Sequence, residues 1–467
     1  MVSQNEIRQE IRIKKSGYVH FDKRMSLNDQ VWTYITNKEK IKAHGFYPFL
    51  HFQQSKFKYQ WSDAENGHRR VTEIKKYRDI LYAAHVDSWI YRYYGALLNK
   101  AYNKFLADTN LDNVPIAYRN NKKGKSNIHF AEEVFAFIKY NKSCYVKVGD
   151  FSNFFDFLDH KYLLKQIRTV IGDKRIPDDS FHVLKSLLQY SYVEYDAIIK
   201  YTGMNHKQLE ERQVILPEED FRSLMRNHRR NGSSDEFFIK KHKANYGIPQ
   251  GSPMSGVLAN IYMIEFDRDI SALVSRYHGI YRRYSDDFII VIPEKYADND
   301  VWNSIDKTIS GMFKSKSSDT KKFLVKLSDE KTHSFFVNVD CNIYDSTKHR
   351  RVLSFLGFSY DGKRIYIRDS SVHRYYMRAY KKARNIVKQN KKLKGNKRRT
   401  TNLYKIYSRV GLKIDRSPNR LISNFPLYSK KAHLVFQKNF PEENRTGLVN
   451  KRHMRKLRKQ LKKNRDK

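Results

Sequence analysis

Two apolar segments that lead into aspartates constrain the fold of this 467-residue chain more than any other feature. Residues 144–149 (CYVKVG) predict a strand that ends at Asp150. Residues 281–292 (YRRYSDDFIIVI) predict a β-hairpin whose turn is Ser-Asp-Asp, which places Asp286 and Asp287 at its tip. We therefore expect the three carboxylates to meet at one edge of a small antiparallel sheet.

Three carboxylates in one place indicate bound cations, because like charges at short range repel each other. Hard divalent ions such as Mg²⁺ or Mn²⁺ prefer oxygen ligands of this kind. Two such ions, about 3.5–4 Å apart, stabilise both the attacking and the leaving oxygens of a phosphoryl displacement. A capping aspartate or an Asp-Asp turn is common by itself, so the prediction rests on the two features together.

Composition points to a polyanionic partner. Lys and Arg number 91 against 49 Asp and Glu, a formal net charge of +42 that nucleic acid would neutralise. Aromatic residues make up 14% of the chain, which excludes a disordered protein. The two cysteines exclude a disulfide scaffold and a cysteine-based zinc site. With no signal peptide and no apolar run of about 20 residues, we expect a cytoplasmic protein without a membrane partner.

The composition and the hydrophobic pattern change along the chain, and together they predict an α+β fold with four parts. Residues 1–114 are rich in Tyr, Lys and Arg, and we expect a helical N-terminal extension. Residues 115–365 mix short apolar runs with Asp, Gly and Pro, as in a lobe built on an antiparallel sheet. Residues 366–450 are basic and helical, with a positive loop near 391–399, and residues 451–467 form a basic tail with ten Lys or Arg.

Some elements are predicted more closely. Apolar and aromatic residues recur at helical spacing over residues 74–99. A helix is expected over 159–171 with Asp159 as its N-cap, and another over 254–270. The polar stretch 200–245 is expected to be an insertion or a long connection.

Six segments, in family order, resemble the motifs of reverse transcriptases, and together they cover about residues 115–360. They are 117–131 (AYRNNKKGKSNIHFA), 144–160 (CYVKVGDFSNFFDFLDH), 246–263 (YGIPQGSPMSGVLANIYM), 283–288 (RYSDDF), 327–332 (LSDEKT) and 354–358 (SFLGF).

The resemblance implies a right-hand polymerase fold of fingers, palm and thumb. Residues 115–365 would form the fingers and an antiparallel palm sheet, and residues 366–450 a thumb. Asp150, Asp286 and Asp287 match the catalytic, metal-binding aspartates of the family. The backbone carbonyl of Phe151 would add a ligand to two Mg²⁺ ions, with Mn²⁺ as an alternative.

The resemblance also assigns residues to the incoming nucleotide and the primer. Phe155 matches an aromatic gate that would clash with a 2′-OH, which implies dNTPs rather than rNTPs as substrates. Gln250 and Gly251 match a turn that packs near the incoming nucleotide and the template base. Leu356 and Gly357 match the motif that seats the primer end.

Basic residues of two motifs are candidates for the triphosphate. Arg119 and Lys125 lie in the fingers motif, where Lys122 and Lys123 are equally placed and a solvated basic loop is the alternative. Lys331 matches a lysine that would neutralise or protonate the leaving pyrophosphate, and a surface lysine is the alternative to that role.

The subgroup of reverse transcriptases that the chain resembles is indicated by the positions where its motifs differ from those of other subgroups, as well as by the positions where they match. Gly256 stands where proline is common, and Ser285 where group II intron enzymes usually have alanine. Retron-type Val-Thr-Gly and intron-type His-Asn-His motifs are absent from the sequence. The chain therefore resembles the unknown-group and abortive-infection reverse transcriptases of bacteria, many of which act in anti-phage defence. This implies an RNA-directed DNA polymerase that copies an RNA template, such as a cognate non-coding RNA, into DNA.

Other functions stay open at the level of sequence. The chain could be an untemplated or homopolymer-forming DNA polymerase, a retron or group II intron type of reverse transcriptase, or a non-catalytic RNA-binding scaffold or maturase. An RNA-dependent RNA polymerase is disfavoured by Phe155. The primer, which could be RNA, DNA or a protein tyrosine, and the oligomeric state, including a homo-oligomer, are also left open.

Overall fold

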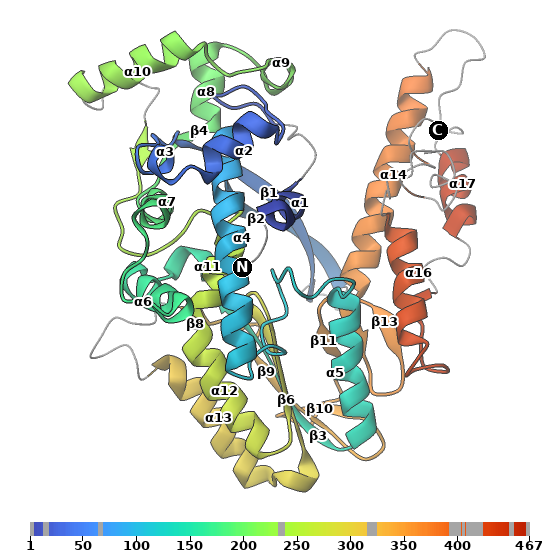
Figure 1. The fold of residues 1–467 in the computed structure, drawn as a ribbon. Coiled ribbons are helices and arrows are strands. Elements are labelled where there is room, and N and C mark those ends of the chain that lie inside the picture. Colours follow the sequence, from blue (N-terminus) through green and yellow to red (C-terminus); the bar gives the residue numbers. More distant parts are fainter. Residues whose placement is uncertain are drawn as a thin grey trace. The chain divides into compact units, whose positions relative to one another are not determined.

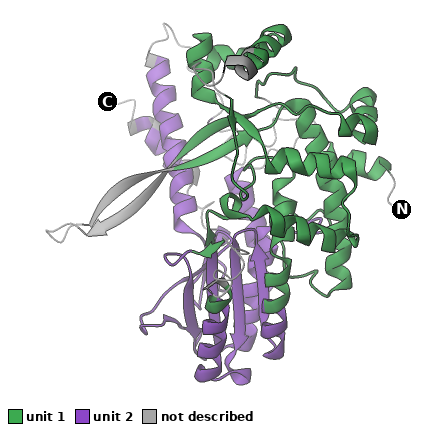
Figure 2. Cartoon of the chain, turned by 90° about the vertical axis from the view of Figure 1, so that its left-hand side faces the viewer, with its two compact units in different colours: residues 1–121, 151–269, 310–327 green, residues 122–150, 270–309, 328–467 purple. Residues whose placement is uncertain are grey.

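The computed structural model describes residues 4–12, 18–63, 69–231, 239–314, 325–391, 403, 407, 424–447 and 453–463. The chain divides into two compact units, coloured green and purple in Figure 2. Unit 1 comprises residues 1–121, 151–269 and 310–327, and unit 2 comprises residues 122–150, 270–309 and 328–467. Each unit is described by itself.

Unit 1 is built around the long helix α4 (His85–Asp108), labelled in Figure 1. Its aromatic side chains include Tyr91 and Tyr102, which are fully buried. A helix with apolar residues on most sides has to be covered, and α4 contacts other helices of its unit along its length. These are α1 (Gln4–Ile11), α2 (Asp29–Thr36), α6 (His160–Ile171), α7 (Asp178–Leu188) and α11 (Ser255–Tyr262). The short helix α3 (Lys38–Lys42) packs on α2 and α7.

A four-stranded sheet belongs to the same unit, and it corrects part of the predicted helical N-terminal extension. The strands are β1 (Phe49–Asp63), β2 (Arg69–Tyr82), β4 (Ser191–Glu194) and β5 (Lys240–Lys241), in the order β2-β1-β4-β5. The helix predicted over 74–99 is therefore wrong for 74–82, where Ile80 and Leu81 lie in β2. Short apolar runs fit both periodicities, and hydrogen bonds to β1, the strand directly before it in the chain, decide the outcome.

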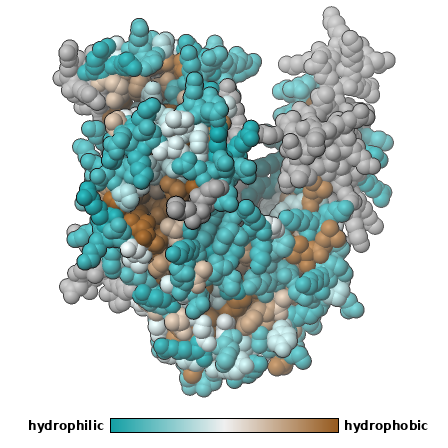
Figure 3. All heavy atoms as spheres, in the orientation of Figure 1, coloured by the Kyte–Doolittle hydropathy of each residue, from teal (hydrophilic) through white to brown (hydrophobic). Residues whose placement is uncertain are grey.

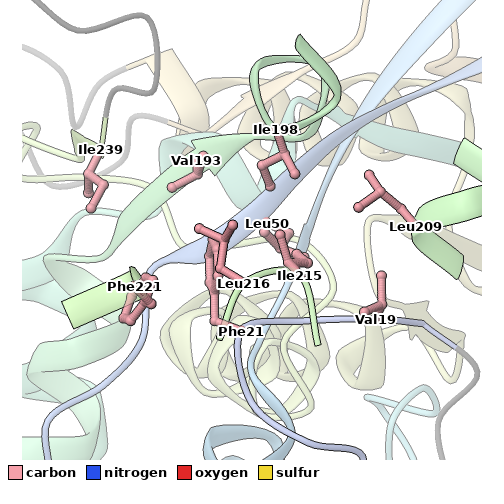
Figure 4. Close-up of a cluster of buried hydrophobic side chains, with 10 residues drawn as sticks. All are labelled: Val19, Phe21, Leu50, Val193, Ile198, Leu209, Ile215, Leu216, Phe221 and Ile239. Atoms are coloured by element: carbon pink, nitrogen blue, oxygen red, sulfur yellow. The ribbon is translucent and has the colours of Figure 1, made fainter. Parts of the chain in front are cut away.

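The described residues of the polar stretch 200–245, which are 200–231 and 239–245, include helices that pack into unit 1. The stretch contains the end of α8 (Tyr195–Thr202) and all of α9 (His206–Glu211) and α10 (Glu218–Asn231). Its few apolar side chains enter a buried cluster with residues from the N-terminal region and from β1 and β4 (Figure 4). The cluster consists of Val19, Phe21, Leu50, Val193, Ile198, Leu209, Ile215, Leu216, Phe221 and Ile239.

The helix predicted over 159–171 is confirmed, whereas the helix predicted over 254–270 is divided into two. Helix α6 begins after Asp159, whose side chain accepts a hydrogen bond from the Tyr162 N–H at 2.7 Å, so the predicted N-cap is confirmed. The single helix predicted over 254–270 is instead α11 followed by α12 (Ile264–Arg276). The break falls at Met263, whose N–H donates to the Asn260 carbonyl at 3.2 Å.

The main sheet of unit 2 is antiparallel, as predicted. Its order is β10-β9-β3-β7-β6, and each neighbouring pair runs antiparallel. The central strands of this sheet are apolar along most of their length. This composition suits strands that are covered, and α5 (Asn127–Asn141) packs on β7. The strands are β3 (Cys144–Ser152), β6 (Ile280–Tyr284), β7 (Asp287–Pro293), β9 (His333–Val337) and β10 (Ile343–Asp345). The far end of β3 pairs with β8 (Lys326–Leu327), and α13 spans Asn299–Lys314.

The last part of unit 2 is a small sheet followed by helices (Figure 1). The sheet contains β11 (Leu353–Phe355), β12 (Phe358–Tyr360) and β13 (Ile365–Ile367). The helices are α14 (Asp369–Lys391), α16 (Phe425–Phe436), which contacts α5, and α17 (His453–Lys463), which contacts α14. The predicted basic helices are thus present, while residues 392–399 of the expected positive loop lie outside the described residues.

The surface seen in Figure 3 is mostly hydrophilic where residues are described, with scattered hydrophobic patches. No helix in the described part of the chain has the length and apolarity needed to cross a bilayer.

Candidate active site

The register of unit 2's main sheet brings the three predicted aspartates together. Asp150 on β3 pairs directly with Asp287 on β7, one position beyond the pair of Gly149 with Phe288. Asp287 also pairs with Tyr284 across the β6–β7 hairpin, which leaves Ser285 and Asp286 as the two-residue turn. All three carboxylates therefore lie at one edge of the sheet, as the strand pattern predicted.

The hairpin turn is held in a rare backbone conformation. Ser285 has a φ of +62°, as at the first central position of a type II′ turn, where glycine is usual. The fully buried Arg283 donates from Nη1 to the Ser285 carbonyl at 3.0 Å. A positive φ at a non-glycine residue persists only where its surroundings enforce it, and here Arg283 holds the turn that carries Asp286.

Close packing at the strand pair requires glycine before the first aspartate. The ring of Phe288 lies against Gly149, and a Cβ at that position would stand 2.2 Å from the ring's Cζ. Phe288 is itself fully buried and cannot move outward. Gly149 therefore allows β3 and β7 to approach closely where they present Asp150 and Asp287.

Lys331 reaches the same edge through a turn fixed to Asp150. The Ser328 N–H donates to the Asp150 carbonyl at 2.8 Å, and the N–H groups of Lys331 and Thr332 donate to the Ser328 carbonyl at 3.1 and 2.9 Å. The Lys331 ammonium then forms an ion pair with Asp150 Oδ2. Asp150 is buried, whereas Lys331 is 55% exposed, so this lysine is open to an approaching ligand.

The carboxylates carry more negative charge than the protein compensates. Desolvation, followed by the charges of Asp286 and Asp150 and a hydrogen bond to Asp150, raises the pKa of Asp287 to about 7. Desolvation is also the largest cause that raises the pKa of Asp286, and Asp150 adds to it. Lys331 acts in the opposite direction on Asp286. The edge is therefore a place where additional positive charge is stabilising.

The donor chemistry of this edge suits a hard divalent cation. Within the described ranges, no three His, Cys, Asp or Glu side chains form a ready group of metal ligands, and Asp150 is bonded to Lys331 and Asp287. The available donors are carboxylate oxygens with unrelieved charge, which Mg²⁺ and Mn²⁺ prefer. Asp150, Asp286 and Asp287 would hold such ions, and the Phe151 carbonyl stays a predicted ligand.

The predicted primer motif forms a second strained turn in unit 2. Phe355 pairs with Phe358, so Leu356 and Gly357 form a two-residue turn with φ of +47° and +89°. Both central residues of a type I′ turn have positive φ, which is unusual for leucine. The Leu356 carbonyl accepts a hydrogen bond from Asn127 Nδ2 at 2.9 Å. The turn is therefore held in place by a residue of α5.

A cavity of about 550 Å³ in unit 1 collects the predicted nucleotide residues Phe155, Gln250 and Gly251. Phe155 comes from the 3₁₀ helix η1 (Phe154–Phe157). Two arginines line the same cavity, Arg78 from β2 and Arg92 from α4. Neither belongs to a motif recognised in the sequence, and no local pattern marks them, because only the packing of β2 and α4 brings them to the cavity.

The Pro-Gln-Gly turn is fastened to the end of β2. The Leu81 N–H donates to the Gln250 carbonyl at 2.8 Å. Gly251 has a φ of +113°, and a Cβ there would lie 2.8 Å from the Leu81 carbonyl oxygen. Gly256, the departure noted in this motif, accommodates the ring of Tyr118, which would lie 2.7 Å from an added Cβ. Both glycines therefore permit close approaches that shape the cavity.

The two basic residues predicted to bind the triphosphate have different surroundings. The Arg119 side chain is fully buried, and it donates to Asn103 Oδ1 at 2.6 Å, to the Asp112 carbonyl at 2.7 Å and to the Pro115 carbonyl at 3.1 Å. It also forms an ion pair with Asp112. Arg119 therefore stabilises its own segment, and its side chain has no surface open to a phosphate. Lys125 belongs to unit 2 and is exposed.

An antiparallel sheet with three aspartates at one edge, together with a Phe and Pro-Gln-Gly cavity, places this α+β chain in the class of polymerase-type proteins. Residues 90–360, more than half of the chain, match the family model described as "Reverse transcriptase (RNA-dependent DNA polymerase)". The chain belongs to the reverse transcriptase family.

Solved structures of telomerase are similar at low identity. Apo telomerase from Candida tropicalis, truncated from its C-terminal domain, is 13% identical, with 77% of this chain and 63% of that chain covered and a TM-score of 0.38. Telomerase from Candida albicans in complex with a fragment of telomeric RNA is 12% identical, with 91% and 61% covered and a TM-score of 0.36. This chain thus spans under two thirds of the length of those telomerases. No curated protein matches it.

Proposed function

We propose that this protein is an RNA-directed DNA polymerase that extends a primer with dNTPs. The observation that supports this most strongly is the pairing of Asp150 with Asp287 across β3 and β7, with Asp286 in the adjoining turn. Binding of RNA alone requires no such concentration of negative charge. A reverse transcriptase family member that keeps all three aspartates is equipped for phosphoryl transfer.

The reaction joins the primer 3′-oxygen to the α-phosphorus of a dNTP and releases pyrophosphate. Asp150, Asp286 and Asp287 would hold two Mg²⁺ ions, with the Phe151 carbonyl as an added ligand. Such ions would supply activation of the 3′-OH and stabilisation of the leaving group. Lys331, paired with Asp150 and open to solvent, offers an ammonium proton to the departing pyrophosphate.

The cavity of unit 1 is proposed as the site of the incoming nucleotide. Its volume of about 550 Å³ is in the usual range for a ligand of that size. Arg78 and Arg92 supply positive charge for the phosphates, since guanidinium groups bind phosphate oxygens well. Phe155 lies in the same cavity and selects against a 2′-OH, while Gln250 and Gly251 contact the base pair being formed.

The decisive experiment is primer extension with a defined RNA template, a DNA primer, dNTPs and Mg²⁺. We expect template-complementary product from the wild type and a loss of about 10³-fold or more from Asp286→Asn and Asp287→Asn. Asp300→Asn, at an exposed position of the same unit, is the matched control and should keep full activity. Equal extension by the aspartate variants would remove the proposal.

Product sequencing separates templated synthesis from its alternative. DNA complementary to a supplied or co-purified RNA supports a reverse transcriptase, whereas random or single-base runs identify an untemplated polymerase of the abortive-infection type.

We also propose that the natural template is a cognate non-coding RNA and that the enzyme serves in bacterial anti-phage defence. The resemblance to the unknown-group and abortive-infection subfamilies and the net charge of +42 support this assignment. Residues 366–450 would act as a thumb on the nucleic-acid backbone, and α17 adds a basic face. Sequencing RNA bound to the protein in its native host, and phage plating with wild type and Asp286→Asn, test both parts.

A further inference from the structure

Arg368 occupies a rigid junction in unit 2 that the sequence motifs do not include. It follows β13 directly and precedes α14. Its N–H donates to the Gly357 carbonyl at 2.9 Å, and its own carbonyl accepts from the Ser371 N–H at 2.9 Å. The backbone is thus fixed on one side to the predicted primer turn and on the other to the first turn of a long helix.

The guanidinium of Arg368 acts electrostatically on the aspartate edge, and one of its donors, Nε, lacks a hydrogen-bond partner in the described part of the chain. Its charge acts on Asp287, whose pKa it lowers against the other influences. Its Nε is buried and has no hydrogen-bond partner among the residues that the structure describes. A buried donor without an acceptor is costly, and a phosphate oxygen bound at this guanidinium would relieve that cost.

The turn formed by Leu356 and Gly357 fixes the backbone position of Arg368. The positive φ values of Leu356 and Gly357 are held by two hydrogen bonds, from Asn127 Nδ2 to the Leu356 carbonyl and from the Arg368 N–H to the Gly357 carbonyl. Asn127 Nδ2 also donates to the Tyr428 hydroxyl of α16 at 2.9 Å. Strain that surrounding contacts maintain is typical of functional positions. The same contacts that hold the turn therefore hold Arg368.

We propose that Arg368 binds a phosphate of the primer strand, at one of the last two linkages before the 3′-OH. This inference rests on the proposed polymerase function, because only then does a primer end lie at the aspartate edge. A guanidinium binds phosphate oxygens through paired N–H groups in a fixed geometry. Arg368 would thereby position the 3′-OH relative to Asp150 and Asp287.

The test pairs a protein variant with a primer variant. A neutral methylphosphonate replaces the phosphate at the last or the second-last primer linkage, and the control primer carries it ten linkages upstream. With wild type we expect a rise of about tenfold in primer KM for one of the two terminal substitutions and almost none for the control. Arg368→Gln should show about the same rise with the natural primer, and no further rise with the methylphosphonate. The KM for dNTP should stay unchanged.

Two further variants guard against a purely structural effect. Arg364→Gln changes an exposed arginine in the turn that joins β12 to β13 and should behave as wild type. Arg368→Lys keeps the charge and should recover part of the primer affinity, with thermal unfolding close to wild type for all variants.

Three results would overturn the assignment. Arg368→Gln could remain as sensitive to the methylphosphonate as wild type, it could change the dNTP KM instead of the primer KM, or it could leave both unaltered. Failure of wild type to extend any primer counts against the proposed function instead. In that case, the equilibrium affinity for the same natural and methylphosphonate primer–template duplexes, measured by fluorescence anisotropy without dNTPs, decides the role of Arg368.

Discussion

Asp150 and Asp287 face each other as paired residues of β3 and β7. Desolvation, followed by the charges of Asp286 and Asp150, raises the pKa of Asp287 to about 7, so the metal-free fold disfavours the ionised form of this carboxyl. A divalent cation bound at this pair would favour the ionised form, because it compensates the negative charges. The antiparallel register of β3 and β7 therefore creates the carboxylate pair on which the proposed metal-dependent phosphoryl transfer depends.

Removing the charge of Asp287 should stabilise the metal-free protein at high pH. Its pKa is raised to about 7, so folding binds a proton that the unfolded chain releases near pH 4, and stability falls as pH rises through this window. In EDTA at pH 8, Asp287→Asn should be more stable than wild type by about 1 kcal/mol, since the Asp287 side chain is desolvated on one side and still reaches solvent, which screens part of the repulsion. At pH 4 the difference should vanish.

Saturating Mg²⁺ should reverse that order. Wild type gains stability by binding the ion in its folded state, whereas Asp287→Asn gains less. Thermal melts at pH 8 with Mg²⁺ or EDTA measure this, and Asp300→Asn serves as the control. An equal Mg²⁺ response from wild type and Asp287→Asn would show that the ion binds elsewhere.

Gly149→Ala should disturb the aspartate edge. The added Cβ would stand 2.2 Å from the buried Phe288 ring, so β3 and β7 have to separate. We expect a loss of about 1–3 kcal/mol in unfolding free energy and a fall of at least about tenfold in primer extension.

The control is Gly311→Ala in α13, where an added Cβ meets nothing within 4 Å. It should be neutral or stabilising by up to about 1 kcal/mol. Full activity in Gly149→Ala would show that the close strand approach does not position the carboxylates.

Stability should also fall as pH drops below about 6.5 because of His20. This imidazole is fully buried in unit 1, where Nδ1 accepts from the Phe21 N–H at 2.8 Å and Nε2 lies 3.3 Å from the Tyr82 carbonyl. Desolvation, with the charge of His85, lowers its pKa from 6.5 to about 3. The unfolded chain therefore binds a proton that the folded chain refuses, and stability is lost from about pH 6.5 down to about pH 3.

The slope should be up to about 1.4 kcal/mol per pH unit from this residue. His20→Gln keeps one acceptor and one donor without a titrating group, so its urea unfolding should depend less on pH between 4 and 6. An identical pH dependence in this variant would contradict the assignment.

Phe155→Ala should relax sugar selection. Shortening the side chain removes the surface that we propose meets a 2′-OH, so rNTP incorporation should rise by about tenfold or more relative to dNTP incorporation. Single-nucleotide kinetics with matched dNTP and rNTP measure the ratio. A ratio equal to that of wild type would remove Phe155 as the gate.

Arg78→Gln should weaken nucleotide binding, whereas Arg119→Gln should weaken the fold. Arg78 lines the cavity of unit 1, so its loss should raise the dNTP KM by about tenfold with little change in unfolding. Arg119 is bonded within the protein, so its loss should destabilise the fold by about 2–4 kcal/mol. Thermal unfolding and dNTP titrations on both variants distinguish them, and a reversed pattern would restore Arg119 as the phosphate ligand.

The sequence by itself determined the aspartate-bearing strands and the family. The runs before Asp150 and around Asp286 and Asp287 are long enough and apolar enough to be central strands, and the polar break between the last two runs predicted a hairpin. The turn was predicted as Ser-Asp-Asp, whereas the structure shows a two-residue turn of Ser285 and Asp286, with Asp287 in β7. The N-cap at Asp159 was predictable for the same reason, because its hydrogen bond spans three residues.

Only the tertiary structure decided which basic residues are available to a ligand. Arg119 belongs to a recognised motif yet is bonded within the protein, whereas Arg78 and Arg92 belong to none and line the cavity. Arg368 likewise gains its role from a hydrogen bond to Gly357. The availability of a charged side chain depends on partners from distant parts of the chain, which periodicity and motif spacing do not encode. The strand at 74–82 was missed for a different reason, since a short apolar run fits both periodicities and its pairing with the preceding strand β1 overrides the local helical pattern.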